Sequence, residues 1–190
     1  MIISDEKRSI ASMVGEWFKK KVAPVCAQYD ASGEFPKELY DGMVELGLNV
    51  MDVPEEYGGL GLDCVEQTLI AEEIGRYEVG MGSAVGVNAS ASHLVRMFCT
   101  DKQKKIFYDI LANGGWAGFC LPEPNAGSDA ASISTTAVLD GDEWVINGTK
   151  CFITNGGIAE VYTVFATVDK SLGIKAVSYT HLTLPTNSRV

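Results

Sequence analysis

The spacing of hydrophobic residues changes near residue 115, and this change sets the fold class. Up to Asn113-Gly114, apolar residues recur at the three- and four-residue spacing of amphipathic helices. After Gly115, short β-branched and aromatic runs alternate with turn dipeptides such as Asp140-Gly141 and Asn147-Gly148. We therefore predict an α+β fold, with an N-terminal all-α helical domain followed by an incomplete antiparallel β-barrel or sheet domain.

Amphipathic patterns predict helices over residues 5–28, 36–47, 63–77 and 100–114. Pro24 should kink or end the last turn of the first helix. Thr100 and Gln103 have the spacing of a capping box, which predicts a helix start at this point. The small-residue segment 80–92 has poor helix propensity and suits a helix packed closely on its neighbours.

Five short runs have strand composition: residues 116–121, 134–139, 143–147, 151–154 and 161–168. The predicted division of the chain is therefore a helical domain over 1–114 and a β domain over 115–175. Residues 176–190, AVSYTHLTLPTNSRV, neither finish a hairpin nor supply a helical pattern. They resemble a translated cloning adapter, so we interpret them as a non-native tail.

Charge and composition exclude several classes of function. The net charge is −10, with 15 basic against 25 acidic residues, which argues against a nucleic-acid partner. The five cysteines show no C-x-x-C spacing and only two histidines are present, so we predict neither disulfides nor a metal site. No apolar run reaches the length of a membrane span and the start does not resemble a signal peptide, so we expect a cytoplasmic protein.

The loop from Leu121 to Asp129 has residues that suit contact with a planar or anionic ligand. Two prolines fix φ, Gly127 permits close approach of the backbone, and Ser128 supplies a hydroxyl. A flavin needs such main-chain donors together with aromatic cover for its ring faces. On loop composition alone, however, an ordinary turn is the favoured interpretation.

Five segments in sequence order resemble the acyl-CoA dehydrogenase family. They are Pro54–Gly59 (PEEYGG), Thr100–Lys104 (TDKQK), Glu123–Asp129 (EPNAGSD), Asn147–Lys150 (NGTK) and Ile153–Gly156 (ITNG). The resemblance covers about residues 4–175. It implies a bound FAD and identifies the chain as the helical domain and part of the middle domain of a longer enzyme.

The resemblance also implies site residues. The cofactor-binding residues would be Phe119, Cys120, Leu121, Pro122, Gly127, Ser128, Phe152, Ile153 and Thr154. Thr154 would place a hydroxyl near flavin N5, and Ser128 would also contact the substrate's thioester arm. Phe152 stands where the family often has Trp, so an indole N–H is missing at this position. Pro122 stands where Thr is usual, so a hydroxyl is missing there.

The implied reaction of the parent enzyme is α,β-dehydrogenation of an acyl-CoA thioester. The catalytic base of most members is a Glu in a C-terminal helical domain, so we assign no catalytic residue here, and we interpret Glu123 as a loop or helix-capping carboxylate. The parent would be a homotetramer that passes electrons to electron-transfer flavoprotein, and this chain alone would be inactive. The alternatives are a flavin monooxygenase or acyl-CoA oxidase of the same fold, or a non-catalytic helical interaction module.

Overall fold

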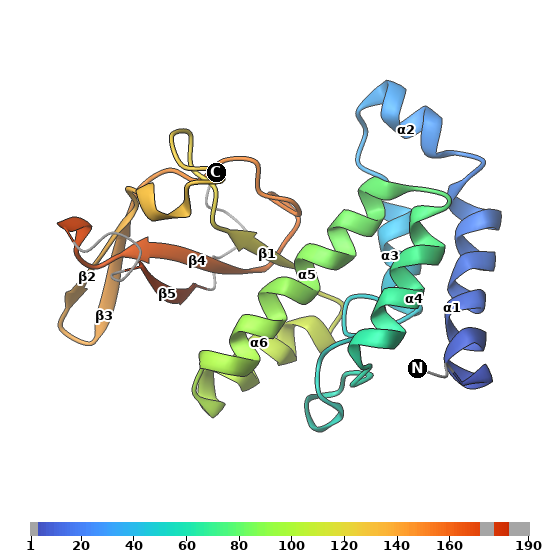
Figure 1. Ribbon diagram of the computed structural model, residues 1–190, viewed down its shortest axis with the longest axis horizontal. Coiled ribbons are helices and arrows are strands. Elements are labelled where there is room, and N and C mark those ends of the chain that lie inside the picture. The colour runs from blue at the N-terminus through green and yellow to red at the C-terminus, as the bar shows by residue number, and fades with distance from the viewer. Residues whose placement is uncertain (1–3, 172–176, 183–190) are drawn as a thin grey trace.

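The computed structural model describes residues 4–171 and 177–182. In these residues six α-helices are followed by five β-strands, and the helices and the sheet lie at opposite ends of the molecule (Figure 1). The α+β fold with segregated layers is therefore confirmed. No helix of the described part has both the length and the apolar character that crossing a bilayer requires.

The first predicted helix is divided into three parts. Helix α1 (Asp5–Trp17) continues into a π-helical turn (Phe18–Val22), and α2 (Cys26–Ser32) follows after a short turn. Pro24 lies in that turn, which confirms that the proline interrupts the helix. The side chains of Phe18 and Val22 are fully buried, so the π-helical turn belongs to the core between α1 and its neighbours.

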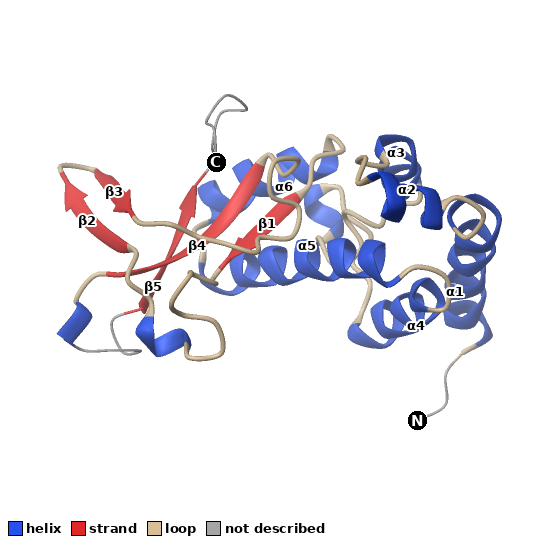
Figure 2. Cartoon of the chain, turned by 90° about the horizontal axis from the view of Figure 1, so that it is seen from above, coloured by secondary structure: helices blue, strands red, loops and turns tan. Residues whose placement is uncertain are grey.

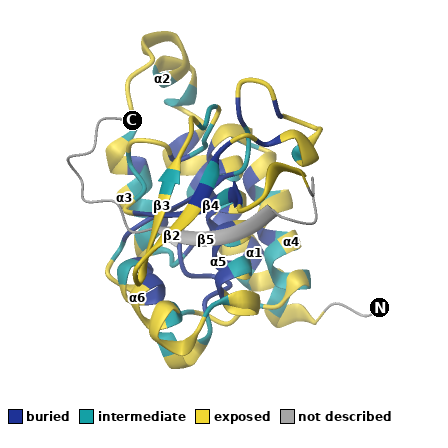
Figure 3. Ribbon diagram, turned by 90° about the vertical axis from the view of Figure 1, so that its left-hand side faces the viewer, coloured by how far each residue is buried: buried dark blue, intermediate teal, exposed yellow. Residues whose placement is uncertain are grey.

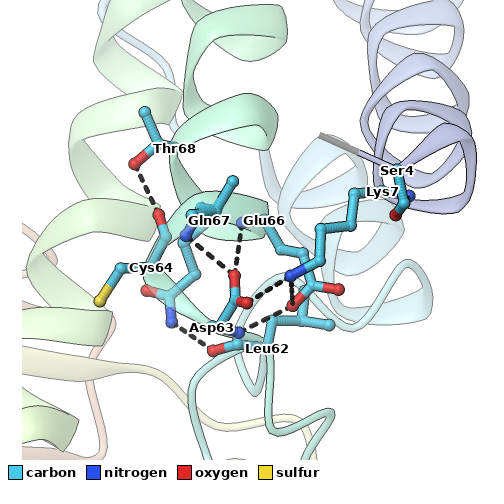
Figure 4. Close-up of polar contacts among 9 residues, drawn as sticks. Ser4, Lys7, Leu62, Asp63, Cys64, Glu66, Gln67 and Thr68 are labelled. Atoms are coloured by element: carbon cyan, nitrogen blue, oxygen red, sulfur yellow. Dashed lines mark hydrogen bonds and ion pairs between the residues drawn. The ribbon is translucent and has the colours of Figure 1, made fainter. Parts of the chain in front are cut away.

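Helix α4 (Cys64–Gly75) begins with a capping box that is linked to α1. The Asp63 carboxylate accepts hydrogen bonds from the backbone N–H groups of Val65 and Glu66, both at 2.9 Å, and Glu66 accepts the Asp63 N–H at 2.8 Å. Lys7 of α1 reaches across to ion-pair with both carboxylates (Figure 4). The start of α4 is thereby held against α1.

Helix α5 (Val79–Phe98) joins the helical part to the sheet. It contains the predicted small-residue segment, and Ala84, Ala91 and Ser92 are buried along it. It packs against α4 and β1 (Ala117–Cys120), and also against α6 (Asp101–Ala112). The prediction of a closely packed helix is confirmed.

The remaining helices follow their sequence signals. Helix α3 (Lys37–Glu45) begins directly after Pro36, and Leu39 and Met43 on it are buried. Helix α6 begins with the predicted capping box, in which Thr100 accepts the Gln103 N–H and Gln103 accepts the Thr100 N–H. It ends at Ala112 with Asn113 as its C-cap, close to the predicted end near Asn113-Gly114.

The sheet is mixed, which corrects the prediction that it is antiparallel. Its other strands are β2 (Thr136–Asp140), β3 (Glu143–Asn147), β4 (Val161–Thr167) and β5 (Val177–Leu182). Strand β4 pairs with three other strands. It is parallel to β1 and, through one residue pair, to β2, and it is antiparallel to β5. Alternation along a strand does not encode the direction of its partner, so composition alone could not distinguish the two arrangements.

The burial of the strands differs strongly across the sheet. Six of the seven residues of β4 are buried, whereas the β2–β3 hairpin is mostly exposed and projects away from the helices (Figures 2 and 3). In the described residues the sheet is not closed into a barrel.

Two further predictions about strands were wrong. Residues 151–154 form a bend and turn rather than a strand, because the backbone of Phe152 adopts a positive φ of 54° that no strand accommodates. No hairpin was predicted over residues 176–190, but β5 pairs antiparallel with β4 over six residues, from Tyr162↔Leu182 to Thr167↔Val177. The non-native origin of this segment stays a prediction. Residues 183–190 of the predicted tail lie outside the described residues.

Candidate functional site

The segment Phe119–Pro122 leaves β1 and begins the proline-rich loop. The ring of Phe119 is half-buried and packs on Phe165, with ring centroids 5.0 Å apart. Cys120 is buried, and burial raises the pKa of its thiol to about 11. Because this side chain faces the core, Cys120 can offer a ligand only its backbone groups.

The segment Phe152–Thr154 presents an unpacked aromatic ring. The Phe152 residue is 93% exposed, although its backbone lies in the left-handed region that costs a bulky residue about 1–2 kcal/mol. Ile153 and Thr154 are half-buried. A strained backbone that places a large apolar ring in solvent is typical of a site that receives a ligand.

These two segments lie side by side. The Cys151 N–H donates to the Pro122 carbonyl at 3.1 Å, and Ile153 packs in one cluster with Cys120 and Tyr162. Seven of the nine predicted cofactor-binding residues therefore belong to one region of the structure.

Gly127 and Ser128 lie further along the loop and are exposed. The loop is closed by paired backbone hydrogen bonds between Glu123 and Ala126, at 2.9 and 3.1 Å. A Cβ atom at Gly127 would meet no atom within 4 Å, so the space beside it is open. Among the described residues, no hydrogen bond links Ser128 to Phe119–Pro122 or to Phe152–Thr154, so its shared role with them stays a prediction.

Glu123 and Lys150 form a buried ion pair next to the two segments. Lys150 Nζ lies 2.8 Å from Glu123 Oε1, and the Glu123 carboxylate also accepts the N–H groups of Ser134 at 2.7 Å and Thr135 at 3.0 Å. Burial alone would raise the pKa of this carboxyl, but Lys150 and the hydrogen bonds from Thr135 and Ser134 outweigh it and hold the pKa well below its ordinary value. Glu123 is thus a loop carboxylate that remains ionised.

The lowered pKa of Glu123 predicts a loss of stability in acid. A depressed folded-state pKa contributes stability above the unfolded value of about 4.3, and this contribution disappears as pH falls below that value. In urea titrations across this range, Glu123→Gln should be less stable than wild type at neutral pH and should lose less stability on acidification. Equal pH dependence in the two proteins would contradict the assignment.

Two buried asparagines connect the helices to the site. Asn88 of α5 donates to the Asn49 carbonyl and accepts the Ala117 N–H, both at 2.7 Å. Asn155 donates to the carbonyls of Ala84 at 3.1 Å and Ala117 at 3.0 Å, and so fixes the turn that follows Thr154. These roles were not predicted, and the only signal in the sequence was Asn155 in the turn tripeptide Asn155-Gly156-Gly157.

A groove of about 610 Å³ runs between α4 and α5 and reaches Phe119. Its walls include small and apolar side chains such as Ala71, Ala89 and Leu94. Asp52 also lines it and is 5% exposed, with an Oδ1 atom that has no hydrogen-bond partner among the described residues. Burial raises the pKa of Asp52, against the opposing effects of Ser92 and Arg96.

The residues of this region include the types that a flavin site uses. Phe152 offers an aromatic face and Thr154 offers a hydroxyl. Further along the loop, Ser128 carries a second hydroxyl beside the open space at Gly127. Within residues 4–171 and 177–182, no group of three or more His, Cys, Asp or Glu side chains is placed to hold a metal ion.

Comparison with known proteins gives consistent matches along the chain. The family "Acyl-CoA dehydrogenase, N-terminal domain" matches residues 4–115, and "Acyl-CoA dehydrogenase, middle domain" matches residues 118–189. A probable acyl-CoA dehydrogenase of Bacillus subtilis, YngJ, is 41% identical over 172 residues, which are 89% of this chain and 45% of that protein.

Solved structures give the same result. Butyryl-CoA dehydrogenase from Megasphaera elsdenii superposes with a TM-score of 0.88 at 33% identity, over 96% of this chain and 49% of that one. A glutaryl-CoA dehydrogenase from Mycobacterium smegmatis, in complex with FADH2, has a TM-score of 0.84 at 30% identity, over 97% of this chain and 46% of that one. The chain therefore spans about half the length of the relatives that it matches.

Proposed function

This chain belongs to the acyl-CoA dehydrogenase family, and we propose that it is the FAD-contacting part of an enzyme that dehydrogenates an acyl-CoA thioester. The observation that carries the proposal is the exposed, strained Phe152 beside Phe119–Pro122. An aromatic ring held in this way can cover one face of an isoalloxazine ring. The match to a structure solved with FADH2 supports the choice of cofactor.

In this proposal the chain binds and orients the flavin and the acyl-CoA substrate. The flavin, when bound, accepts the hydride from the substrate β-carbon. Phe119 and Phe152 would shield the ring, and Thr154 would donate a hydrogen bond at N5, where negative charge increases as the hydride arrives. Ser128 would contact the cofactor phosphates and the thioester arm. We assign removal of the α-proton to no residue of this chain.

The groove beside Phe119 would hold the acyl chain, because small and apolar side chains form much of its wall. The proposed partners of the parent enzyme are an acyl-CoA substrate and electron-transfer flavoprotein, its assembly is a homotetramer, and its location is the cytoplasm. These assignments rest on the family.

Titration of the purified chain with FAD, followed by flavin fluorescence, tests the function. We expect weak binding and no bleaching of the bound flavin by butyryl-CoA, whereas a coding region extended to include a C-terminal helical domain should yield a yellow protein that butyryl-CoA bleaches. Absence of flavin from the extended protein would exclude the cofactor assignment. Bleaching by the 190-residue chain alone would instead show that this chain is sufficient for activity.

The exposure of Phe152 predicts opposite effects on stability and on FAD binding. Phe152→Gly should raise the free energy of unfolding by about 1 kcal/mol, because glycine relieves the left-handed backbone and little packing is lost. The same change should weaken FAD binding by roughly tenfold, the effect of losing about 1.4 kcal/mol of ring contact. Phe98→Ala removes another exposed ring, 65% exposed, and should leave FAD binding unchanged. Unaltered FAD affinity in Phe152→Gly would remove Phe152 from the site.

A further inference from the structure

The Glu123–Lys150 pair is the most buried ion pair of the described part of the chain. The Lys150 side chain is 11% exposed and that of Glu123 is 2% exposed. In each of the other ion pairs found within residues 4–171, both side chains are at least 17% exposed. Burial to this degree distinguishes the pair from the exposed ion pairs, which contribute little to stability.

Every polar contact of the pair is with the loop or with the chain that leads out of it. Lys150 Nζ donates to the Leu121 carbonyl at 3.0 Å as well as to Glu123. Glu123 Oε2 accepts both the N–H and the hydroxyl of Ser134 at 2.7 Å, and Oε1 accepts the Thr135 N–H at 3.0 Å. The pair therefore joins three separate stretches of backbone.

The two charged residues adjoin the two predicted flavin-contacting segments. Glu123 directly follows Pro122, and Lys150 precedes Phe152 by two residues. Phe119 and Cys120 end strand β1, but the rest of both segments, Leu121–Pro122 and Phe152–Thr154, belongs to no strand. One backbone hydrogen bond, from Cys151 to Pro122, connects the two segments directly. Their relative placement therefore depends strongly on side-chain contacts.

Charged hydrogen bonds fix the relative placement of two segments better than apolar packing does. Hydrophobic contact is non-directional, whereas a charge-assisted hydrogen bond fixes both the distance and the direction of its partners. A buried ion pair adds little stability compared with an apolar pair of similar volume, but it can specify one arrangement.

We propose that Glu123 and Lys150 are positioning residues, which hold Phe119–Pro122 and Phe152–Thr154 at the separation that FAD binding requires. The identity of the ligand rests on the function proposed above, whereas the coupling between the two segments does not. Neither residue is assigned a contact with the flavin.

Two readouts on the full chain test this proposal. The first is hydrogen exchange at the Cys151 amide, which reports directly on the contact between the segments. In Lys150→Met this amide should exchange roughly tenfold faster or more, while amides in α6 keep wild-type protection. The second is FAD affinity, which should fall by roughly tenfold in Lys150→Met and in Glu123→Gln, whereas Lys150→Arg should recover part of it.

Two control variants separate positioning from general destabilisation. Val22→Ala lowers the stability of the helical core at a fully buried site far along the chain from the pair. Lys105→Met removes an exposed lysine that pairs with Asp109 at 2.9 Å. Both should retain wild-type FAD affinity and wild-type exchange at Cys151.

The outcomes are distinguishable. If Cys151 exchange in folded Lys150→Met equals that of wild type, the positioning role is wrong. If Val22→Ala weakens FAD binding as much as Lys150→Met does, it is also wrong. If Cys151 exchange rises in Lys150→Met as expected, but neither the wild-type chain nor the protein extended by a C-terminal helical domain binds FAD, the coupling between the two segments is supported and the proposed cofactor is wrong.

Discussion

Asn88→Ala should lower the free energy of unfolding by about 3 kcal/mol or more, because it leaves two buried backbone groups without partners. Asn88 is 1% exposed and bonds the Asn49 carbonyl and the Ala117 N–H. Each buried group left unpaired costs about 1–3 kcal/mol. Urea unfolding of the variant measures the loss directly.

The neighbouring Ser90→Ala variant is the matched control. The Ser90 hydroxyl donates only to the Gly86 carbonyl of its own helix and is exposed, so its removal should change stability by no more than about 0.5 kcal/mol. A loss below about 1 kcal/mol in Asn88→Ala would show that water or local rearrangement satisfies the two groups. The connection between α5 and β1 would then be weaker than the hydrogen bonds indicate.

Gly59→Ala should destabilise the chain by about 3 kcal/mol, since the space for its methyl group is already filled by backbone. A Cβ atom there would lie 2.0 Å from the Val53 carbonyl oxygen and 2.4 Å from the Val53 Cβ atom. The loop cannot easily move away, because Leu60 donates to Val50 at 3.0 Å and Gly61 donates to Val53 at 2.9 Å. Thermal unfolding should show a clear decrease in Tm.

Gly86→Ala provides the opposite expectation within the same chain. Gly86 lies inside α5, and a Cβ atom there would meet no atom within 4 Å. Alanine is favoured over glycine in a helix interior by about 1 kcal/mol, so this variant should be more stable than wild type. Equal losses at Gly59 and Gly86 would refute the steric explanation.

Local signals predicted the helices well. The capping box at Thr100, the interruption at Pro24 and the helix end at Asn113 each depend on residues close together in sequence, and each is found in the structure. Such features can be predicted because a cap or a proline acts on its own turn of backbone. The short π-helical turn, which buries Phe18 and Val22 in the core, has no comparable local signal in the sequence.

Long-range pairing could not be predicted from composition. The parallel alignment of β1 with β4 pairs segments that are distant in sequence. Strand β5 is the next strand after β4, and its pairing was missed because residues 176–190 were interpreted as a non-native tail. Residues 151–154 were assigned to a strand because they are β-branched and aromatic, yet tertiary contacts at Lys150 and Asn155 hold them in a turn. Tertiary contacts therefore outweigh the strand propensity of residues 151–154.

The candidate site was only partly visible in the sequence. The loop and the Ile153–Gly156 segment could be identified, and the structure brings Phe119–Pro122 beside Phe152–Thr154. The interactions that hold this arrangement could not be foreseen. A Glu in a proline-rich loop and a Lys after Asn-Gly-Thr give no sign that they are partners, because burial of a charged pair is a property of the folded chain.

The parallel pairing of β1 with β4 also determines the order in which this chain can assemble during synthesis. Ala117 pairs with Val161 in the ladder, so β1 cannot pair until β4 has been synthesised. The β2–β3 hairpin, by contrast, pairs residues that are close in sequence. Before β4 is present, α5 and α6 can pack against the start of β1. The backbone edge of β1 that pairs with β4 is then unpaired and can bind another chain. Any delay between the appearance of β1 and that of β4 would prolong this exposure and favour pairing of β1 with another chain.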